Sequence, residues 1–444
     1  MRKLRFRLVS LCLLAVGWFC PRVAAQQPAG KSELFPSDKL NQNLPKWLRL
    51  SGEFRARAEG YTNGGFKANS DDAYLLSRFR INLKVQPSEW LKFVVQGQDA
   101  RVFWKNQHPA APPFQDVMDL RLGYVELGDA EKRSVSLRIG RQELAFGDER
   151  LVGNTNWLNT AHSFDALRLT YHGGGYRLDA FASSVVNQRD GKFDESNPGN
   201  NFYGLYGGMD KLVPKAVVEP YFFWRRAAGQ HMENGAPGTL NFGTVGLRWV
   251  GALPRALDYG TEMALQAGSL GADRIGAWAG HWLLGYTLAP LPYRPRLVAE
   301  YNYASGDRNP HDGRRGTFDQ LYPTAHDKYG LADQVGWKNI EHLRGGVEVK
   351  PRARWLAMAK YNSWWLASSH DALYNTRSLV VAQVPDGSGG RFVGQGVDLQ
   401  TVYSLSKQVQ ISGGYSYLIP GTFLKKATPG KPYTFPYLSL NYIF

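Results

Sequence analysis

The sequence predicts an all-β protein, a single transmembrane antiparallel up-and-down β-barrel of about 18 strands with short periplasmic turns and long extracellular loops. Three observations predict it: apolar and polar side chains alternate along most of the chain, short turns alternate with long polar loops, and the chain ends in an alternating segment that finishes on Phe444. Alternation with a period of two indicates strands with two different faces. A mean hydropathy of −0.37 fits such a barrel, because every second residue faces a wet lumen.

Residues 1–25 have the composition of a secretory signal peptide. A basic start is followed by an apolar stretch over 8–20 and by the small residues 23–25. The apolar stretch is shorter than the roughly 20 residues that a spanning helix needs, which argues against the alternative of an N-terminal membrane anchor. Both cysteines, Cys12 and Cys20, lie in this segment, so the mature chain is expected to have none.

The charge predicts acidic partners. The formal net charge is +15, and removal of the signal segment, with five basic and no acidic residues, lowers it to +10. A basic balance favours nucleic acid, anionic lipid or an anionic substrate. Export makes nucleic acid the least expected of the three.

Residues 26–46 are polar, contain three prolines and are expected to form a periplasmic lead-in, with the barrel over 47–444. Residues 48–60 place Phe54 and other apolar residues on one face and arginines on the other. Residues 77–85 repeat the pattern, with Phe79 on the apolar face. A soluble sandwich would show the same alternation, so the connections have to decide between the two folds.

The connections alternate between two lengths, which is typical of outer-membrane barrels. Short ones lie at 87–90, 173–175, Pro214, Pro254, Pro351 and 405–407, and long ones at 61–72, 102–118, 142–163, 187–201, 227–240, 306–339, 367–393 and 419–434. Strands of about ten residues between them give roughly eighteen, with the division ambiguous in 202–226 and 258–287. In the last segment Leu438, Leu440, Tyr442 and Phe444 share one face, as expected of a final membrane strand.

If the apolar face meets lipid, the opposite face lines the lumen. A charge on the lipid face would cost about 2–4 kcal/mol at the midplane. The inward phase then carries many cations, namely Arg49, Arg55, Arg57, Arg78, Arg80, Lys84, Lys92, Arg121, Arg138, Arg168, Arg248, Arg296, Arg344 and Lys360, and fewer acids, namely Glu53, Glu59, Glu262, Glu300, Glu348 and Asp398. We expect about half of these charges to pair with one another, and the excess of arginine to attract anions.

Residues 139–169 resemble the signature of the alginate-export family of outer-membrane porins. Three blocks carry the resemblance: 140–142 (Gly-Arg-Gln), 147–150 (Gly-Asp-Glu-Arg) and 163–165 (Ser-Phe-Asp). Weaker echoes lie at 304–308, 359–365, 394–398 and 417–421.

The resemblance implies an eighteen-stranded barrel with an arginine-rich constriction that passes an anionic polyuronate outward. By position it assigns constriction roles to Arg138, Arg141 and Asp165. The chain departs from the family pattern at Ala166, where glycine is usual, and at Val397, where an acid is frequent. The alternation of side chains puts Asp165 with Leu167 on the lipid side unless a bulge intervenes, which leaves its role open.

The residues expected to line the pore or bind substrate are all charged, and they lie on or beside the face of the strands that is expected to point into the lumen. They are Arg55, Arg57, Arg78, Arg80, Arg121, Arg138, Arg141, Asp165, Arg168, Arg248, Arg344 and Lys360. No cofactor, metal or catalytic residue is expected. The acids and histidines of 306–339 could hold calcium, but their spacing favours a polar lid. His281 and His342 lack the local nucleophile motif and the orienting third group that an enzyme would need.

The leading functional hypothesis is an anion-selective channel in the outer membrane of a Gram-negative cell that exports an alginate-like anionic polysaccharide. The alternative is an uptake porin for small organic anions, and a third is a plugged barrel acting as an enzyme or adhesin. Expected partners are the permeating anion, outer-membrane lipid and periplasmic export components, with the barrel as a monomer. The sequence leaves open the polymer, the direction of transport, the oligomeric state and whether 306–339 plugs the pore.

Overall fold

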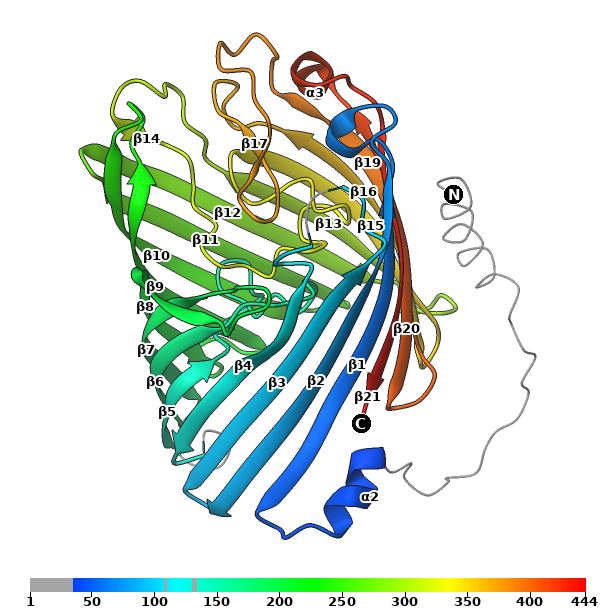
Figure 1. The fold of residues 1–444 in the computed structure, drawn as a ribbon. Helices are drawn as coiled ribbons and strands as arrows, with labels where there is room; N and C mark the ends of the chain where they lie inside the picture. The colour runs from blue at the N-terminus through cyan, green and yellow to red at the C-terminus, as the bar shows by residue number, and fades with distance from the viewer. Residues whose placement is uncertain (1–34, 108–109, 130–133) are drawn as a thin grey trace.

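Eighteen antiparallel strands close into one barrel in the computed structural model, which describes residues 35–107, 110–129 and 134–444 (Figure 1). Each strand pairs with its neighbours in sequence, and the first and last pair with each other, with Glu53 opposite Ile443 and Glu59 opposite Tyr437. This closure confirms the predicted fold class. The expected signal peptide lies outside the described residues.

The barrel strands are mostly longer than ten residues. They are β1 (Leu48–Tyr61), β2 (Asp72–Ser88), β3 (Leu91–Phe103), β4 (Asp116–Leu127), β5 (Val135–Gln142), β6 (Phe164–Gly173), β7 (Tyr176–Asn187), β8 (Glu195–Met209), β9 (Ala216–His231), β10 (Pro237–Leu253), β11 (Leu257–Leu270), β12 (Asp273–Thr287), β13 (Arg296–Ala304), β15 (Ile340–Arg352), β16 (Trp355–Trp365), β19 (Phe392–Ser404), β20 (Val409–Pro420) and β21 (Tyr433–Ile443). The N-terminal segment before β1 carries α2 (Pro36–Gln42). The long connections carry η1 (Gly64–Phe66), β14 (Arg314–Arg315), β17 (Leu373–Tyr374), β18 (Val380–Ala382) and α3 (Thr422–Ala427). No helix in the described ranges is long and apolar enough to cross a membrane.

The two ends of the barrel differ as predicted, with tight turns at one end and long loops at the other (Figure 1). One departure is that β8, β9 and β10 extend far into the segments expected as the loops 187–201 and 227–240. These polar segments form strands all the same, because the hydrogen bonds between strands need only backbone donors and acceptors. A second departure is the two-residue turn at 271–272, which is tight although it lies at the loop end.

The wall has an apolar outside and a polar inside. On β2 the residue Phe79 is 38% exposed, whereas its neighbour Arg80 is 3% exposed. Leu167 on β6 and Leu343 on β15 are likewise exposed on the outer face. Because successive side chains of a strand point to opposite faces, this pattern puts the apolar side against lipid and the charged side in the lumen.

The polar inside is not an empty tube. Two of the long connections turn back into the barrel instead of standing above it, as the inward course of the segments before β6 and β15 shows in Figure 1. We call residues 143–163 the first inner loop and residues 316–339 the second inner loop. They narrow the lumen and define the candidate site.

Candidate pore constriction

The two inner loops are joined to each other inside the barrel. Val152 and Tyr322 form an isolated parallel bridge. Tyr322 donates its backbone N–H to the carbonyl of Leu151 at 2.8 Å, and Gly153 donates to the carbonyl of Tyr322 at 2.9 Å. The ring of Trp157 also stacks on that of His326, with centroids 3.5 Å apart. The loops therefore act as one body across the lumen.

Aromatic packing draws the start of the first inner loop against the wall. Phe146 stacks on Tyr206 of β8 with ring centroids 4.8 Å apart, and on Phe181 of β7 at 5.5 Å. Gly147 follows with a φ of +56°, a conformation that glycine adopts at little cost. A hydrophobic cluster therefore sits on the inner face of β7–β9, where a fully water-filled pore would be polar.

The arginines of β1 and β2 hold the middle of the first inner loop. Arg55 donates to the carbonyl oxygens of Asn156 at 2.7 Å and Leu158 at 3.0 Å. Arg78 donates to the same two carbonyls at 2.9 and 3.0 Å. Arg57 donates to the carbonyl of Trp157 at 2.6 Å, and its guanidinium lies 3.7 Å over the Trp157 ring. Five hydrogen bonds from three guanidinium groups thus hold the backbone of residues 156–158 against β1 and β2.

Arg150, which lies between Phe146 and this middle part, anchors the loop to β12 and β13. Its guanidinium contacts Glu300 at 3.2 Å and the Nε2 atom of His281 at 3.1 Å. Glu300 also lies 3.4 Å from Arg344 of β15. One buried carboxylate thus bridges a loop cation and a wall cation.

The second inner loop is held by β15, β16 and β19. Asp327 forms an ion pair with Lys360 and lends its backbone carbonyl to Arg344 at 2.7 Å. Trp364 donates its indole N–H to the carbonyl of Tyr329 at 2.8 Å, and Leu331 donates its backbone N–H to Asp398 at 3.1 Å. Both polar and aromatic residues of the wall therefore contribute to this attachment.

The match to known proteins covers nearly the whole barrel. A family model described as alginate export matches residues 46–433. The chain belongs to the alginate export family. It is therefore an outer-membrane channel, since the matched region is the closed barrel with an apolar outer face. The resemblance seen in the sequence is thereby confirmed.

Solved structures with the same fold share little sequence with this alginate-export family barrel. OpdQ of Pseudomonas aeruginosa is 13% identical over 89% of this chain and 97% of that chain, with a TM-score of 0.60. OccAB2 of Acinetobacter baumannii is 10% identical over 89% and 98%, also with a TM-score of 0.60. At these identities the likeness shows the fold alone. A comparison with curated protein sequences finds no match.

Ten of the twelve residues expected in the pore lie on the inner face of the wall. They are Arg55, Arg57, Arg78, Arg80, Arg121, Arg138, Arg168, Arg248, Arg344 and Lys360. All but Arg55 have a carboxylate within 4.0 Å among the described residues, the partners being Glu59, Glu53, Glu143, Glu126, Asp179, Glu219, Glu300 and Asp327. Pairing is thus more extensive than the expected half, and the role of these residues toward a permeant stays a prediction.

Arg141 and Asp165 correct the sequence-based expectation, because they do not line the lumen. On β6 Asp165 lies opposite Arg141 of β5, and two residues further on Leu167 lies opposite Ile139, with no break in register. Leu167 and Ile139 are exposed on the outer face, so Asp165 and Arg141 are on that face too. Arg141 donates two parallel bonds to Asp165, at 2.9 and 3.1 Å. The pair sits where β5 and β6 end at the loop side, and a paired charge at this rim avoids the cost of an isolated one in lipid.

The loops enclose a cavity of about 590 Å³ at the mouth. Its lining includes Arg225 from β9, Lys338 from the second inner loop and Arg377 from the connection between β17 and β18. Arg225 pairs with Asp319 at 2.9 Å. The side chains of Lys338 and Arg377 make no hydrogen bond or ion pair with any described residue. Sequence analysis missed all three, because loop residues have no period and 202–226 was ambiguous.

Proposed function

We propose that this channel exports an anionic, alginate-like polysaccharide and that the cavity at its mouth binds the carboxylates of the passing chain. The observation that carries the proposal is the pair of cations, Lys338 and Arg377, that face the cavity without a carboxylate partner. The Nζ atom of Lys338 lies 4.5 Å over the ring of Tyr374 and makes no polar contact with the described residues. Burial lowers the pKa of Lys338 and that of Arg377. An entering carboxylate offsets the cost of burying these two cations, because an opposite charge favours the ionised form.

The wall beside the first inner loop adds positive charge to the passage. Five guanidinium groups gather there, from Arg55, Arg57, Arg78, Arg80 and Arg121. The carboxylates that pair with them number three in the described residues: Glu53, Glu59 and Glu143. An excess of fixed cations in a confined passage favours anions over cations. Several weak sites of this kind suit translocation, because a permeant has to leave as well as enter.

A second candidate, uptake of small organic anions, is favoured by the inner loops themselves. Joined through Val152 and Tyr322, they cross the lumen and leave less room than the bare barrel would. A narrow passage suits a small carboxylate, whereas a polymer has to thread past the loops as a single extended chain. The two functions share the cations and differ in the size of the permeant.

Planar-bilayer conductance tests both candidates. The wild-type channel is expected to show a reversal potential of an anion-selective pore in a KCl gradient, and oligouronates are expected to block it from the side of the cavity. The Lys338→Gln/Arg377→Gln double variant should weaken that block by about tenfold, the equivalent of 1.4 kcal/mol, with Lys426→Gln on the exposed face of α3 as the matched charge control. Block by small organic anions alone favours uptake. Cation selectivity in the wild type would overturn both.

A further inference from the structure

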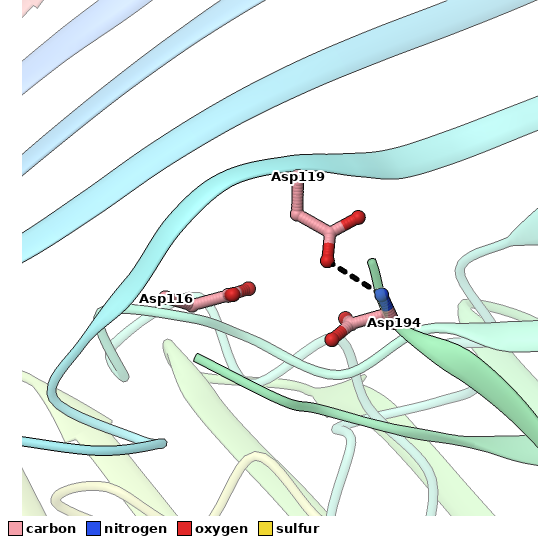
Figure 2. Close-up of side chains that lie close together, drawn as sticks. All are labelled: Asp116, Asp119 and Asp194. Carbon is pink, nitrogen blue, oxygen red and sulfur yellow. Dashed lines mark hydrogen bonds between the residues drawn. The ribbon is translucent and has the colours of Figure 1, made fainter. Parts of the chain in front are cut away.

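Three carboxylates from separate parts of the chain converge inside the mouth of the barrel. Asp116 and Asp119 belong to β4, and Asp194 precedes β8 (Figure 2). One oxygen of each lies within 4.8 Å of one oxygen of each of the others. Two ligand oxygens on opposite sides of a Ca²⁺ ion lie about 4.6–5.2 Å apart, twice the usual Ca–O distance. The spacing therefore matches that of oxygens around one calcium ion.

An irregularity in the wall creates this convergence. Residues three apart on a regular strand point to opposite faces. The register between β3 and β4 shifts between Gln98 and Ala100, and Met118 has a φ of +55°. This bulge turns both Asp116 and Asp119 inward, toward the segment that carries Asp194. The wall thus departs from regular geometry at the point where the acids meet.

The carboxylate of Asp116 lacks the partners that a buried charge needs. Asp116 is 1% exposed, and its Oδ1 atom accepts no hydrogen bond from the described residues. It points into the space between the other two carboxylates (Figure 2). Asp119, which is 5% exposed, accepts the backbone N–H of Asp194 on Oδ2 at 2.7 Å, but its Oδ1 has no partner. A buried ionised carboxylate without a partner is expensive, so these oxygens call for a cation.

The two arginines that contact Asp194 have their guanidinium groups engaged elsewhere. Arg141 is bound to Asp165 and reaches Asp194 only at its backbone oxygen, at 3.2 Å. Arg189 gives its backbone N–H to Asp194 Oδ1 at 2.8 Å, while its guanidinium pairs with Glu195 at 2.5 Å. The cluster as it stands is a site of unbalanced negative charge.

We propose that Asp116, Asp119 and Asp194 bind a divalent cation, calcium in preference to magnesium. Carboxylate oxygens are the ligands that hard cations prefer, and calcium tolerates an irregular shell completed by backbone oxygens and water, whereas magnesium demands a near-ideal octahedron. The bound ion ties the start of β4 to residues 188–194 and so stiffens the rim beside the cavity. This site is separate from the acids of the 306–339 loop. For those acids the sequence favours a polar lid over a calcium site.

Calorimetric titration of the detergent-purified barrel, stripped with EDTA, tests the site. Ca²⁺ is expected to bind with one-to-one stoichiometry at micromolar to millimolar concentration, the range of calcium sensors and extracellular modules, and more tightly than Mg²⁺. Asp116→Asn should weaken binding at least tenfold, and Asp194→Asn should do the same. Asp312→Asn, which removes an exposed charge at the same end of the barrel, should leave binding unchanged.

Thermal unfolding distinguishes a lost site from a misfolded variant. In EDTA, Asp116→Asn should melt at or above the temperature of the wild type, because it removes a repelled charge. In saturating Ca²⁺ the order should reverse, since a ligand stabilises only the form that binds it. Absence of Ca²⁺ binding by the wild type, or equal binding by Asp116→Asn, would overturn the proposal.

Discussion

The first inner loop meets two regions of the wall in different ways. At β1 and β2, wall arginines donate to neutral backbone carbonyls of residues 156–158. At β12, β13 and β15, the loop's own Arg150 enters a buried network with Glu300 and Arg344. The first region holds the loop and keeps a positive excess, whereas the second holds it by cancelling charge. Residues 156–158 are thus secured by cations that we propose also favour anions, whereas Arg150 is secured by a charge-balanced network.

The strongest test of this contrast is Glu300→Gln. Both Arg150 and Arg344 would lose their shared carboxylate in a buried site, and loss of one partner of a buried pair costs about 3–5 kcal/mol. We expect that loss in the free energy of unfolding, measured by urea titration in lipid vesicles. Single-channel conductance should also rise, because the loop is freed at Arg150.

The control for this variant is Glu195→Gln. Glu195 pairs with Arg189, but its side chain is 59% exposed, and such pairs contribute about 0–1 kcal/mol. If the two variants were destabilised equally, burial would not be what makes the Glu300 network strong, and the contrast between the two regions would fail.

Arg55→Met probes the other region and should cost less, about 1–3 kcal/mol, because it removes only hydrogen bonds to neutral carbonyls that Arg78 continues to bind. The lower part of that range is expected, since Arg55 lies directly opposite Arg78 and its removal relieves like-charge repulsion. Arg55→Met should also lower the anion preference measured in planar bilayers, whereas Glu300→Gln should leave that preference unchanged.

Arg49→Met is the matched variant for Arg55→Met. Arg49 lies on the same strand and in the same phase, but it is exposed and bonds only to the nearby carbonyls of Pro45 and Leu48. Its replacement should change neither stability nor selectivity measurably. A loss of selectivity from Arg49→Met as large as that from Arg55→Met would show that anion preference depends on any positive charge on β1, wherever it lies.

The phase of the wall could be predicted from the sequence because lipid imposes it residue by residue. Phe79 and Arg80 have only one arrangement that avoids a charge in hydrocarbon, and the structure has that arrangement. The inner loops could not be predicted in the same way. Their attachment depends on single contacts between distant residues, such as Arg55 with Asn156, that leave no period in the sequence.

Local irregularities account for the remaining differences. The bulge at Met118 and the partner that Arg141 finds in Asp165 depend on register between strands, which alternation within one strand does not encode, although that alternation does set the face on which Asp165 lies. The resemblance assigned Arg141 and Asp165 to the constriction, although the alternation already placed Asp165 with Leu167. Where the two disagreed, the physical constraint of the strand was the better guide.

Gly147→Ala should have a smaller effect than Glu300→Gln and one no larger than that of Arg55→Met. Gly147 has a φ of +56°, and an added Cβ atom would lie 2.9 Å from Arg248 Cδ and 2.6 Å from the Tyr206 hydroxyl. Those two side chains can move, so the main cost is the left-handed backbone, about 1–2 kcal/mol. Urea titration should show that loss with unchanged selectivity. Gly191→Ala, also at positive φ but with open space around it, separates backbone strain from crowding.

The smallest expected effect is a loosening of the first inner loop in acid through His162. Burial lowers the pKa of His162 to about 4, and the nearby charge of Arg121 adds to this shift. A released loop would restore a pKa near 6.5, so the released form binds more protons wherever the pH lies below that value. The attached form should therefore lose stability as the pH falls from about 6.5 toward 4, with no dependence on His162 above 6.5.

Protease cleavage of the loop, compared at pH 7, 5.5 and 4.5, should increase with acidity in the wild type more than in His162→Gln. The effect should be modest because the ring lines the cavity, where solvent can reach it, and identical pH profiles for the two proteins would mean that His162 has no part in holding the loop.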